Sequence, residues 1–104
     1  MAKVFTDDNF QEEVLDNEGL SIVDYWAPWC TPCRIQGPIM EDIAEQMPEI
    51  NIGKLNVDEN PTISARYGIM SIPTLKFFKN GQEVAEMIGL QSKDTLLAKI
   101  NELK

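Results

Sequence analysis

The stretch LSIVDYWAPWCTPC, residues 20–33, decides the fold of this chain. Its first eight residues, LSIVDYWA (20–27), form a nearly continuous apolar run, which is typical of a parallel strand that is covered on both faces. Apolar residues then recur at helical spacing from Cys33 to Met47, with Pro38 at a position where a kink is expected. A buried strand that leads directly into an amphipathic helix predicts a strand–helix unit of an α/β protein.

The segments on either side of this unit extend the alternation of strands and helices. KVF (3–5) is predicted to be a short strand. Thr6 and the two aspartates after it, Asp7 and Asp8, are candidate N-caps for a helix that ends before Gly19, because Ser, Thr, Asp and Asn favour that position. Pro48 ends the helix after the cysteines, and the residues INIGKLNV (50–57) alternate as in a third strand.

The second half of the chain predicts a short helix and then a hairpin. Asn60 is expected to cap the short helix, with Pro61 at its first position. The runs TLKFF (74–78) and EVAEMI (83–88) read as two strands, and the Asn80-Gly81 pair between them favours a tight hairpin turn.

A final helix, capped by Ser92, completes the order β-α-β-α-β-α-β-β-α. The alternation in the first part implies right-handed parallel crossovers, and the hairpin adds an antiparallel edge. The prediction is an α/β sandwich around one mixed sheet. The length of 104 residues suits a single domain, and we find no repeat or linker.

Composition excludes several classes of function. The chain has 17 acidic and 9 basic residues, hence a net charge of −8, and it has no histidine. Without histidine, Ser-His-Asp and Cys-His catalysis and His-ligated metals are excluded. Residues 4–33 carry carboxylates but no lysine or arginine, and the charge opposes nucleic-acid binding.

No apolar run approaches the roughly 20 residues that a membrane span needs. The start, MAKVFTDDNF, lacks the charged and apolar regions of a signal peptide. We therefore expect a cytoplasmic protein without membrane contact, unless a leader has already been removed.

Both cysteines lie in the segment Trp29-Cys30-Thr31-Pro32-Cys33, between a strand and a helix. Unpaired N–H groups and the positive end of the helix dipole favour the thiolate of Cys30. Cys33 is one turn further on and can reach Cys30 to form or break a disulfide. Pro32 suits the first turn and stiffens the loop.

Three other interpretations of the two thiols are less favourable. A structural disulfide over so short a ring would stabilise the fold by only about 2 kcal/mol, and such bonds are rare in the cytoplasm. A zinc or iron–sulfur site needs about four ligands, which only a dimer sharing a cluster would supply. Two inert core thiols would seldom lie in such a loop. Redox exchange without a metal fits best.

The stretches VDYWAPWCTPC, KLNVDENP, YGIMSIPTLKFFKNG and the later pair Ile88-Gly89 resemble the thioredoxin family in order and spacing, over nearly the whole chain. The resemblance implies a thioredoxin-like three-layer sandwich over residues 1–104, with about five strands and about four helices. It implies a monomer that reduces protein disulfides with no cofactor beyond its own redox-active disulfide. A thioredoxin reductase, either a flavoprotein that uses NADPH or a ferredoxin-dependent enzyme, would recharge it.

The resemblance also assigns roles within the site. Cys30 corresponds to the attacking cysteine, Cys33 to the resolving cysteine, and Asp24 to a buried acid that exchanges a proton with Cys33. Asp24 is also unusual by itself, because it is a single carboxylate in an apolar strand, where burial raises the pKa; a solvated strand end is the alternative. Lys54 corresponds to the partner of Asp24, although alone it would read as a solvated strand residue.

Ile72-Pro73 corresponds to the family's cis-proline loop, where the backbone of the residue before proline pairs with an extended target. The apolar rim around the sulfur corresponds to Trp29, Pro32, Ile72, Pro73, Ile88 and Gly89. A simple core role suits Trp26 better than Trp29, and Gly89 also reads as a turn residue.

Four residues depart from the usual family pattern: Thr31, Arg34, Gly37 and Ser71. Thr31 replaces a glycine between the cysteines and is expected to tune the redox potential. Two other functions compete with that of a reductase. One is a binding subunit of a larger complex that does not use its thiols, and the other is an oxidant or isomerase of an exported compartment.

Overall fold

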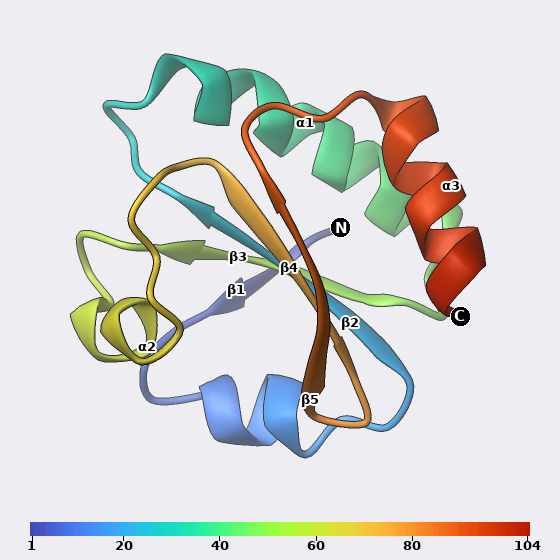
Figure 1. Cartoon of the computed structure of the whole chain (residues 1–104), viewed down its shortest axis with the longest axis horizontal. Coiled ribbons are helices and arrows are strands. Elements are labelled where there is room, and N and C mark those ends of the chain that lie inside the picture. Colours follow the sequence, from blue (N-terminus) through green and yellow to red (C-terminus); the bar gives the residue numbers. More distant parts are fainter.

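A five-stranded mixed sheet forms the centre of the molecule, as a computed structural model of residues 1–104 shows (Figure 1). The strands are β1 (Lys3–Phe5), β2 (Leu20–Trp26), β3 (Asn51–Asn56), β4 (Thr74–Lys79) and β5 (Gln82–Ile88). Their order across the sheet is β1-β3-β2-β4-β5. β3 pairs in parallel with β1 and β2, whereas β4 pairs antiparallel with β2 and β5. The predicted mixed sheet is confirmed.

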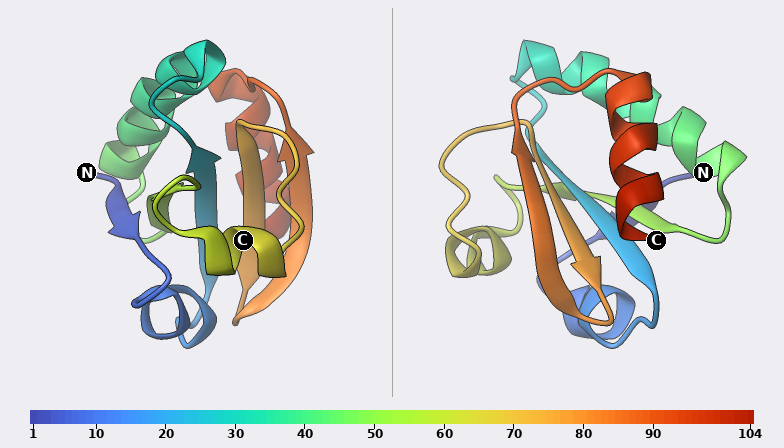
Figure 2. Two further views of the ribbon diagram at one scale, coloured as in Figure 1. Left: turned by 90° about the vertical axis from the view of Figure 1, so that its left-hand side faces the viewer. Right: turned by 45° about the vertical axis from the view of Figure 1, so that its right-hand side comes forward.

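Four helices cover the two faces of this sheet, which gives three layers (Figure 2). They are η1 (Gln11–Leu15), α1 (Thr31–Gln46), α2 (Pro61–Arg66) and α3 (Lys93–Leu103). α1 and α3 lie on one face, and η1 and α2 lie on the other. α1 continues through Pro38, which is exposed.

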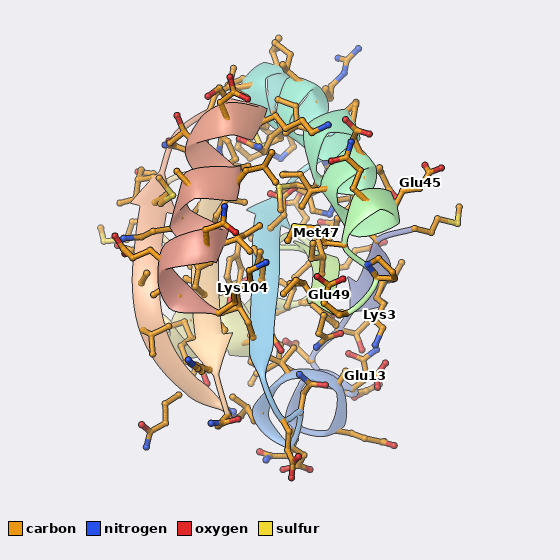
Figure 3. All side chains as sticks on the ribbon, turned by 90° about the vertical axis from the view of Figure 1, so that its right-hand side faces the viewer. Lys3, Glu13, Glu45, Met47, Glu49 and Lys104 are labelled. Atoms are coloured by element: carbon orange, nitrogen blue, oxygen red, sulfur yellow. A yellow bond between two sulfur atoms is a disulfide. The ribbon has the colours of Figure 1, made fainter.

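Each face of the sheet has its own hydrophobic core, and β2 contributes to both. Ile22 packs with Ile43 of α1 and Ile100 of α3, whereas Val23 packs on the face that η1 and α2 cover. Every residue from Leu20 to Tyr25 is buried, as expected for a strand that is apolar on both sides. Figure 3 shows Met47, just beyond α1, against the first core, whereas Glu45 points away from the molecule.

The first helix differs from a regular α-helix. Thr6 does not cap η1 as predicted, because Phe10 holds the N-cap position and no side chain caps the helix there. Thr6 instead pairs with Asn9 in the turn before η1: the Thr6 hydroxyl accepts the N–H of Asn9 at 3.1 Å, and the Asn9 side chain accepts the N–H of Thr6 at 2.7 Å. The helical turn that follows, Gln11–Leu15, has the wider π spacing.

The cap of α2 corrects the sequence prediction. Asn60 precedes α2, but its side chain does not cap the helix; it donates to the carbonyl of Asn56 at 3.0 Å and accepts the N–H of Asp7 at 2.8 Å. The carboxylate of Asp7 instead accepts the N–H groups of Thr62, at 3.2 Å, and Ile63, at 2.9 Å. A side chain distant in sequence therefore supplies the capping oxygens.

Replacing this capping carboxylate is expected to lower stability. Asp7→Ala removes the acceptor of two helix N–H groups and should reduce the free energy of unfolding by about 1 kcal/mol, as the loss of a helix cap does. Asp8→Ala is the matched control, because Asp8 is exposed and makes no side-chain hydrogen bond. Urea denaturation measures both variants. Equal stability of the two would show that Asp7 does not act as a cap.

The hairpin turn and the cap of the last helix are confirmed. Asn80 and Gly81 both have positive φ, 52° and 82°, as a tight hairpin turn between β4 and β5 requires. A side chain at Gly81 would collide with the backbone carbonyl of Leu15, so this turn also packs on η1. The Ser92 hydroxyl accepts the N–H of Thr95 at 3.2 Å and caps α3.

Candidate active site

Cys30 occupies the N-cap of α1, directly after the loop that leaves β2. Its N–H donates to the carbonyl of Ala27 at 3.2 Å, which folds the loop back on itself. Cys30 and Cys33 form a disulfide, with their Cα atoms 5.2 Å apart. The N–H of Cys33 donates to Cys30 Sγ at 3.3 Å, so the sulfur takes the place of a capping oxygen.

This position suits a sulfur anion. The first N–H groups of a helix have no partner within the helix, and the helix dipole adds positive potential there. The N–H of Cys33 already points at Cys30 Sγ, and a thiolate would accept the same bond more strongly than a disulfide does. Cys30 and Cys33 are only 5% and 2% exposed. The geometry therefore favours a thiolate on Cys30. The surrounding residues cover most of both cysteines and limit the access of a target to them.

Asp24 is completely buried on β2 and has no hydrogen-bond partner for either carboxylate oxygen. Residues two apart on a strand share a face, so Asp24 lies on the same side as Ile22, under α1. Burial raises its pKa to about 7, and the ammonium of Lys54 opposes that rise. Asp24 is therefore not at a solvated strand end, which excludes the simpler interpretation.

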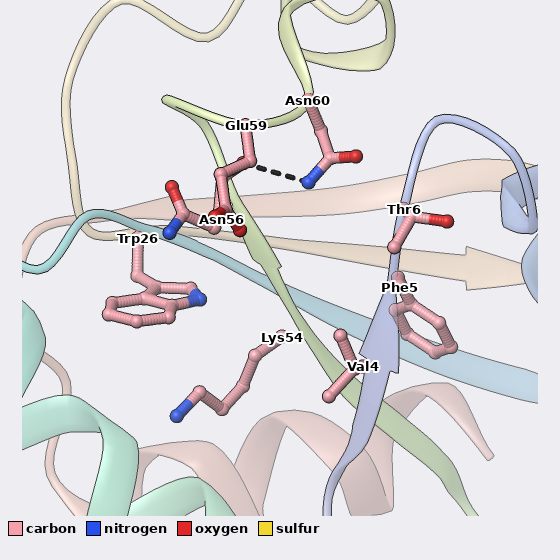
Figure 4. A pocket seen from close by; sticks show the side chains of 8 residues that line it. All are labelled: Val4, Phe5, Thr6, Trp26, Lys54, Asn56, Glu59 and Asn60. Atoms are coloured by element: carbon pink, nitrogen blue, oxygen red, sulfur yellow. Dashed lines mark hydrogen bonds between the residues drawn. The ribbon is translucent and has the colours of Figure 1, made fainter.

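Lys54 lies directly opposite Asp24 in the register of β3 and β2. Its side chain is half-buried, and its Nζ is 4.7 Å from the centre of the Trp26 ring, which is a cation–π contact (Figure 4). Trp26 is only partly buried, so it is not the simple core residue that its place in the strand predicted. Both side chains line a cavity of about 150 Å³, together with Val4, Phe5, Thr6, Asn56, Glu59 and Asn60.

The sheet brings the other predicted site residues to the end where β2 meets the cysteines. Thr74, the first residue of β4, pairs with Tyr25 of β2 and with Ile88 of β5. The loops beyond these three residues therefore lie at one end of the sheet (Figure 1). Ile72-Pro73 is cis, as the resemblance implied, and the carbonyl of Pro73 accepts the N–H of Gly89 at 2.8 Å.

Large apolar side chains are exposed in these loops. Trp29 is 69% exposed and Ile88 60% exposed, in agreement with a binding rim rather than a core. Sequence reasoning missed three further exposed apolar residues beside the predicted positions: Ile35, Met70 and Leu90. Their position in the sequence could have identified them, because each lies within two residues of a predicted site residue.

Among the predicted rim residues, Trp29 has a side-chain hydrogen bond. The indole Nε1 of Trp29 donates to Asp58 Oδ2 at 2.9 Å, which fixes the ring against the loop after β3; sequence reasoning missed Asp58. Thr31 and Pro32 are exposed on the first turn of α1. The Thr31 hydroxyl makes no hydrogen bond with either sulfur in this oxidised state.

The structure also bears on metal binding and on membrane insertion. No group of three or more Cys, Asp or Glu side chains is arranged to hold a metal ion. None of the helices combines the length and the apolar character that a membrane span requires.

Two disulfide-bonded cysteines at a helix N-terminus, a buried carboxylate on the strand that leads to them and exposed apolar side chains at the same end of the sheet are the features of a protein of dithiol–disulfide exchange. Residues 1–102 match the family model described as Thioredoxin. The chain belongs to the thioredoxin family, and its Cys30–Cys33 pair is the redox-active disulfide of a protein-disulfide reductase.

Individual relatives agree with this assignment. The chain is 48% identical to a thioredoxin of Pyropia yezoensis over 98 residues, which cover 93% of this chain and 92% of the relative. It is 49% identical to thioredoxin 1 of a Nostoc species over 96 residues, 91% of this chain and 90% of the relative. A thioredoxin of Rickettsia bellii is 45% identical over 102 residues, 97% of each chain.

Proposed function

We propose that Cys30 is the attacking nucleophile and Cys33 the resolving thiol of this reductase. The Cys30 thiolate attacks one sulfur of a target disulfide, forms a mixed disulfide and expels the other target sulfur as a thiolate. The Cys33 thiolate then attacks Cys30 Sγ and releases the second target thiolate, so two electrons pass to the target. The bond from the Cys33 N–H to Cys30 Sγ is the observation that supports this assignment, because the same N–H would stabilise a thiolate on Cys30 in the reduced protein.

Asp24 accepts the proton of the Cys33 thiol when that thiol becomes a nucleophile. A buried carboxylate whose pKa is about 7 exchanges protons readily near neutral pH. Lys54, opposite it on β3, limits the rise of that pKa and keeps part of the Asp24 population ionised. The buried position of Asp24 on the α1 side of β2 supports this role.

The target binds as an extended segment over the apolar rim. Neither the N–H nor the carbonyl of Ile72 makes a hydrogen bond within the chain, so both are free to pair with a target strand. Trp29, Pro32 and Ile88 are exposed and Gly89 is partly exposed, and their apolar atoms would bury part of the target. Pro73 is itself buried, so it would contribute through its backbone rather than through an exposed ring.

The protein works as a cytoplasmic monomer without a bound cofactor, and a thioredoxin reductase returns its disulfide to the dithiol. The test measures reduction of insulin disulfides by this protein, driven in one arm by an NADPH-dependent flavoprotein reductase and in the other by a ferredoxin-dependent one. Turnover in either arm identifies the electron donor. If insulin is reduced in neither arm, and also not when dithiothreitol supplies the electrons, the result favours the role of a binding subunit.

Thr31 is expected to make the protein more oxidising than its Thr31→Gly variant. A hydroxyl that donates to the Cys30 thiolate but not to the disulfide stabilises only the reduced form, and the oxidised state lacks such a bond. A weak charge-assisted bond of about 1.5 kcal/mol corresponds to about 30 mV for a two-electron couple. Equilibration of both proteins with glutathione measures the difference. An unchanged potential would leave Thr31 with no role in redox tuning.

A further inference from the structure

Gln36 is a buried polar side chain whose partners lie outside its own helix. It is on α1, one turn after Cys33, and it is completely buried. Residues three apart on a helix share a face, so Gln36 follows Cys33 on the inner side of α1. A buried amide that lacked partners would be costly, which makes its bonding pattern informative.

Both ends of the Gln36 amide bind one residue of the loop after β5. Gln36 Oε1 accepts the N–H of Gln91 at 2.7 Å, and Gln36 Nε2 donates to the carbonyl of Gln91 at 3.2 Å. Nε2 also lies 3.6 Å from the sulfur of Met40. The side chain therefore pairs with the backbone of Gln91 as a neighbouring strand would.

Gln91 carries this link onward to the rim. Its side-chain Nε2 donates to the carbonyls of Ile88 and Gly89, each at 3.3 Å. The N–H of Gly89 in turn donates to the carbonyl of Pro73 at 2.8 Å. A continuous chain of hydrogen bonds thus joins the helix that carries the cysteines to the segment Ile88–Leu90 and to the cis-proline loop.

We propose that Gln36 is a positioning residue that fixes the segment Ile88–Leu90 relative to the reactive sulfur and so favours protein disulfides over small ones. The inference rests on the proposed function of the rim. A protein target must contact Ile88 and Gly89 while its disulfide meets Cys30, so a displaced rim weakens its binding. A small disulfide contacts only the reactive sulfur, so a displaced rim does not change the rate of its reduction.

The test compares Gln36→Met with Gln46→Met. Methionine keeps the length of glutamine but cannot form the paired bonds, and Gln46 is an exposed residue on the last turn of the same helix. Reduction of insulin and of bis(2-hydroxyethyl) disulfide is measured for each variant and for the wild type. Gln36→Met should raise KM for insulin about 3- to 10-fold, the size of effect that lost neutral hydrogen bonds have, with kcat unchanged.

The rate of reduction of the small disulfide distinguishes a positioning role of Gln36 from an effect of Gln36 on the thiols. Its rate should be the same in Gln36→Met, Gln46→Met and the wild type. Equal losses with both substrates would overturn the proposal, because Gln36 would then act on the cysteines. An unchanged KM for insulin would overturn it as well. A wild type that fails to reduce insulin would instead contradict the proposed function.

Two further measurements keep the inference testable if Gln36→Met folds poorly. Gln91→Met removes the bonds to the carbonyls of Ile88 and Gly89 from a half-buried site, and it should raise KM for insulin in the same direction. Hydrogen exchange at the Gln91 amide should quicken in Gln36→Met and stay unchanged in Gln46→Met. Unchanged KM in Gln91→Met would count against the proposal.

Discussion

Cys30→Ser should abolish disulfide reduction, whereas Cys33→Ser should form a mixed disulfide with the target and stop there. The first variant lacks the nucleophile that attacks the target. The second retains that nucleophile at the helix N-terminus but lacks the thiol that releases it. Insulin turnover measures the loss in both variants, and mass spectrometry under non-reducing conditions detects the adduct on Cys30.

The double variant Cys30→Ser/Cys33→Ser is the control for adducts at other positions, because the chain has no other cysteine. It should form none. An adduct that accumulates on Cys33 in Cys30→Ser, and not on Cys30 in Cys33→Ser, would reverse the two roles. Turnover by Cys30→Ser at the rate of the wild type would end the assignment of Cys30 as the nucleophile.

Asp24→Asn should stabilise the oxidised protein by about 4 kcal/mol at pH 8 and by almost nothing at pH 4. The folded pKa of Asp24 is about 7, against an ordinary value of 3.8. Between these values the folded state binds more protons than the unfolded state, so the stability of the wild type falls as the pH rises. Three pKa units correspond to about 4 kcal/mol, and asparagine carries no such penalty.

Urea denaturation at several pH values measures this difference, and Asp8→Asn is the control for a change of charge on an exposed residue. A constant difference between Asp24→Asn and the wild type at all pH values would show that the Asp24 pKa is not raised. Asp24→Asn should also slow the release of target by Cys33 above pH 7, where Asp24 is ionised and accepts the proton. Identical pH–rate profiles would remove Asp24 from proton transfer.

The elements of the fold follow from local sequence, because their signals are short-range. The apolar run of β2, the Asn80-Gly81 turn and the Ser92 cap each specify their structure within a few residues. The cap of α2 does not, because Asp7 reaches it from a segment 55 residues away and only the folded chain brings them together. The π turn of η1 likewise has no local signature in the sequence.

The residues of the site likewise fall into two groups: those that local sequence identifies and those that only the folded structure identifies. The cysteines are apparent because their spacing and their place after a strand are local. The roles of Asp24 and Lys54 depend on the register of β2 and β3, which places them opposite each other. Gln36 was not recognised because a single amide on the inner face of a helix gives no indication of its partner. Only the structure shows that the partner is the backbone of Gln91.

The position of β1 constrains the order in which a growing chain acquires its structure. β1 pairs only with β3, in the register Lys3 with Gly53, Val4 with Lys54 and Phe5 with Leu55. During synthesis, β1 therefore has no strand with which to pair until residues 51–56 have left the ribosome. Phe5, completely buried in the finished protein, stays exposed for that interval. An apolar side chain that stays exposed for that interval is a point at which the nascent chain can aggregate.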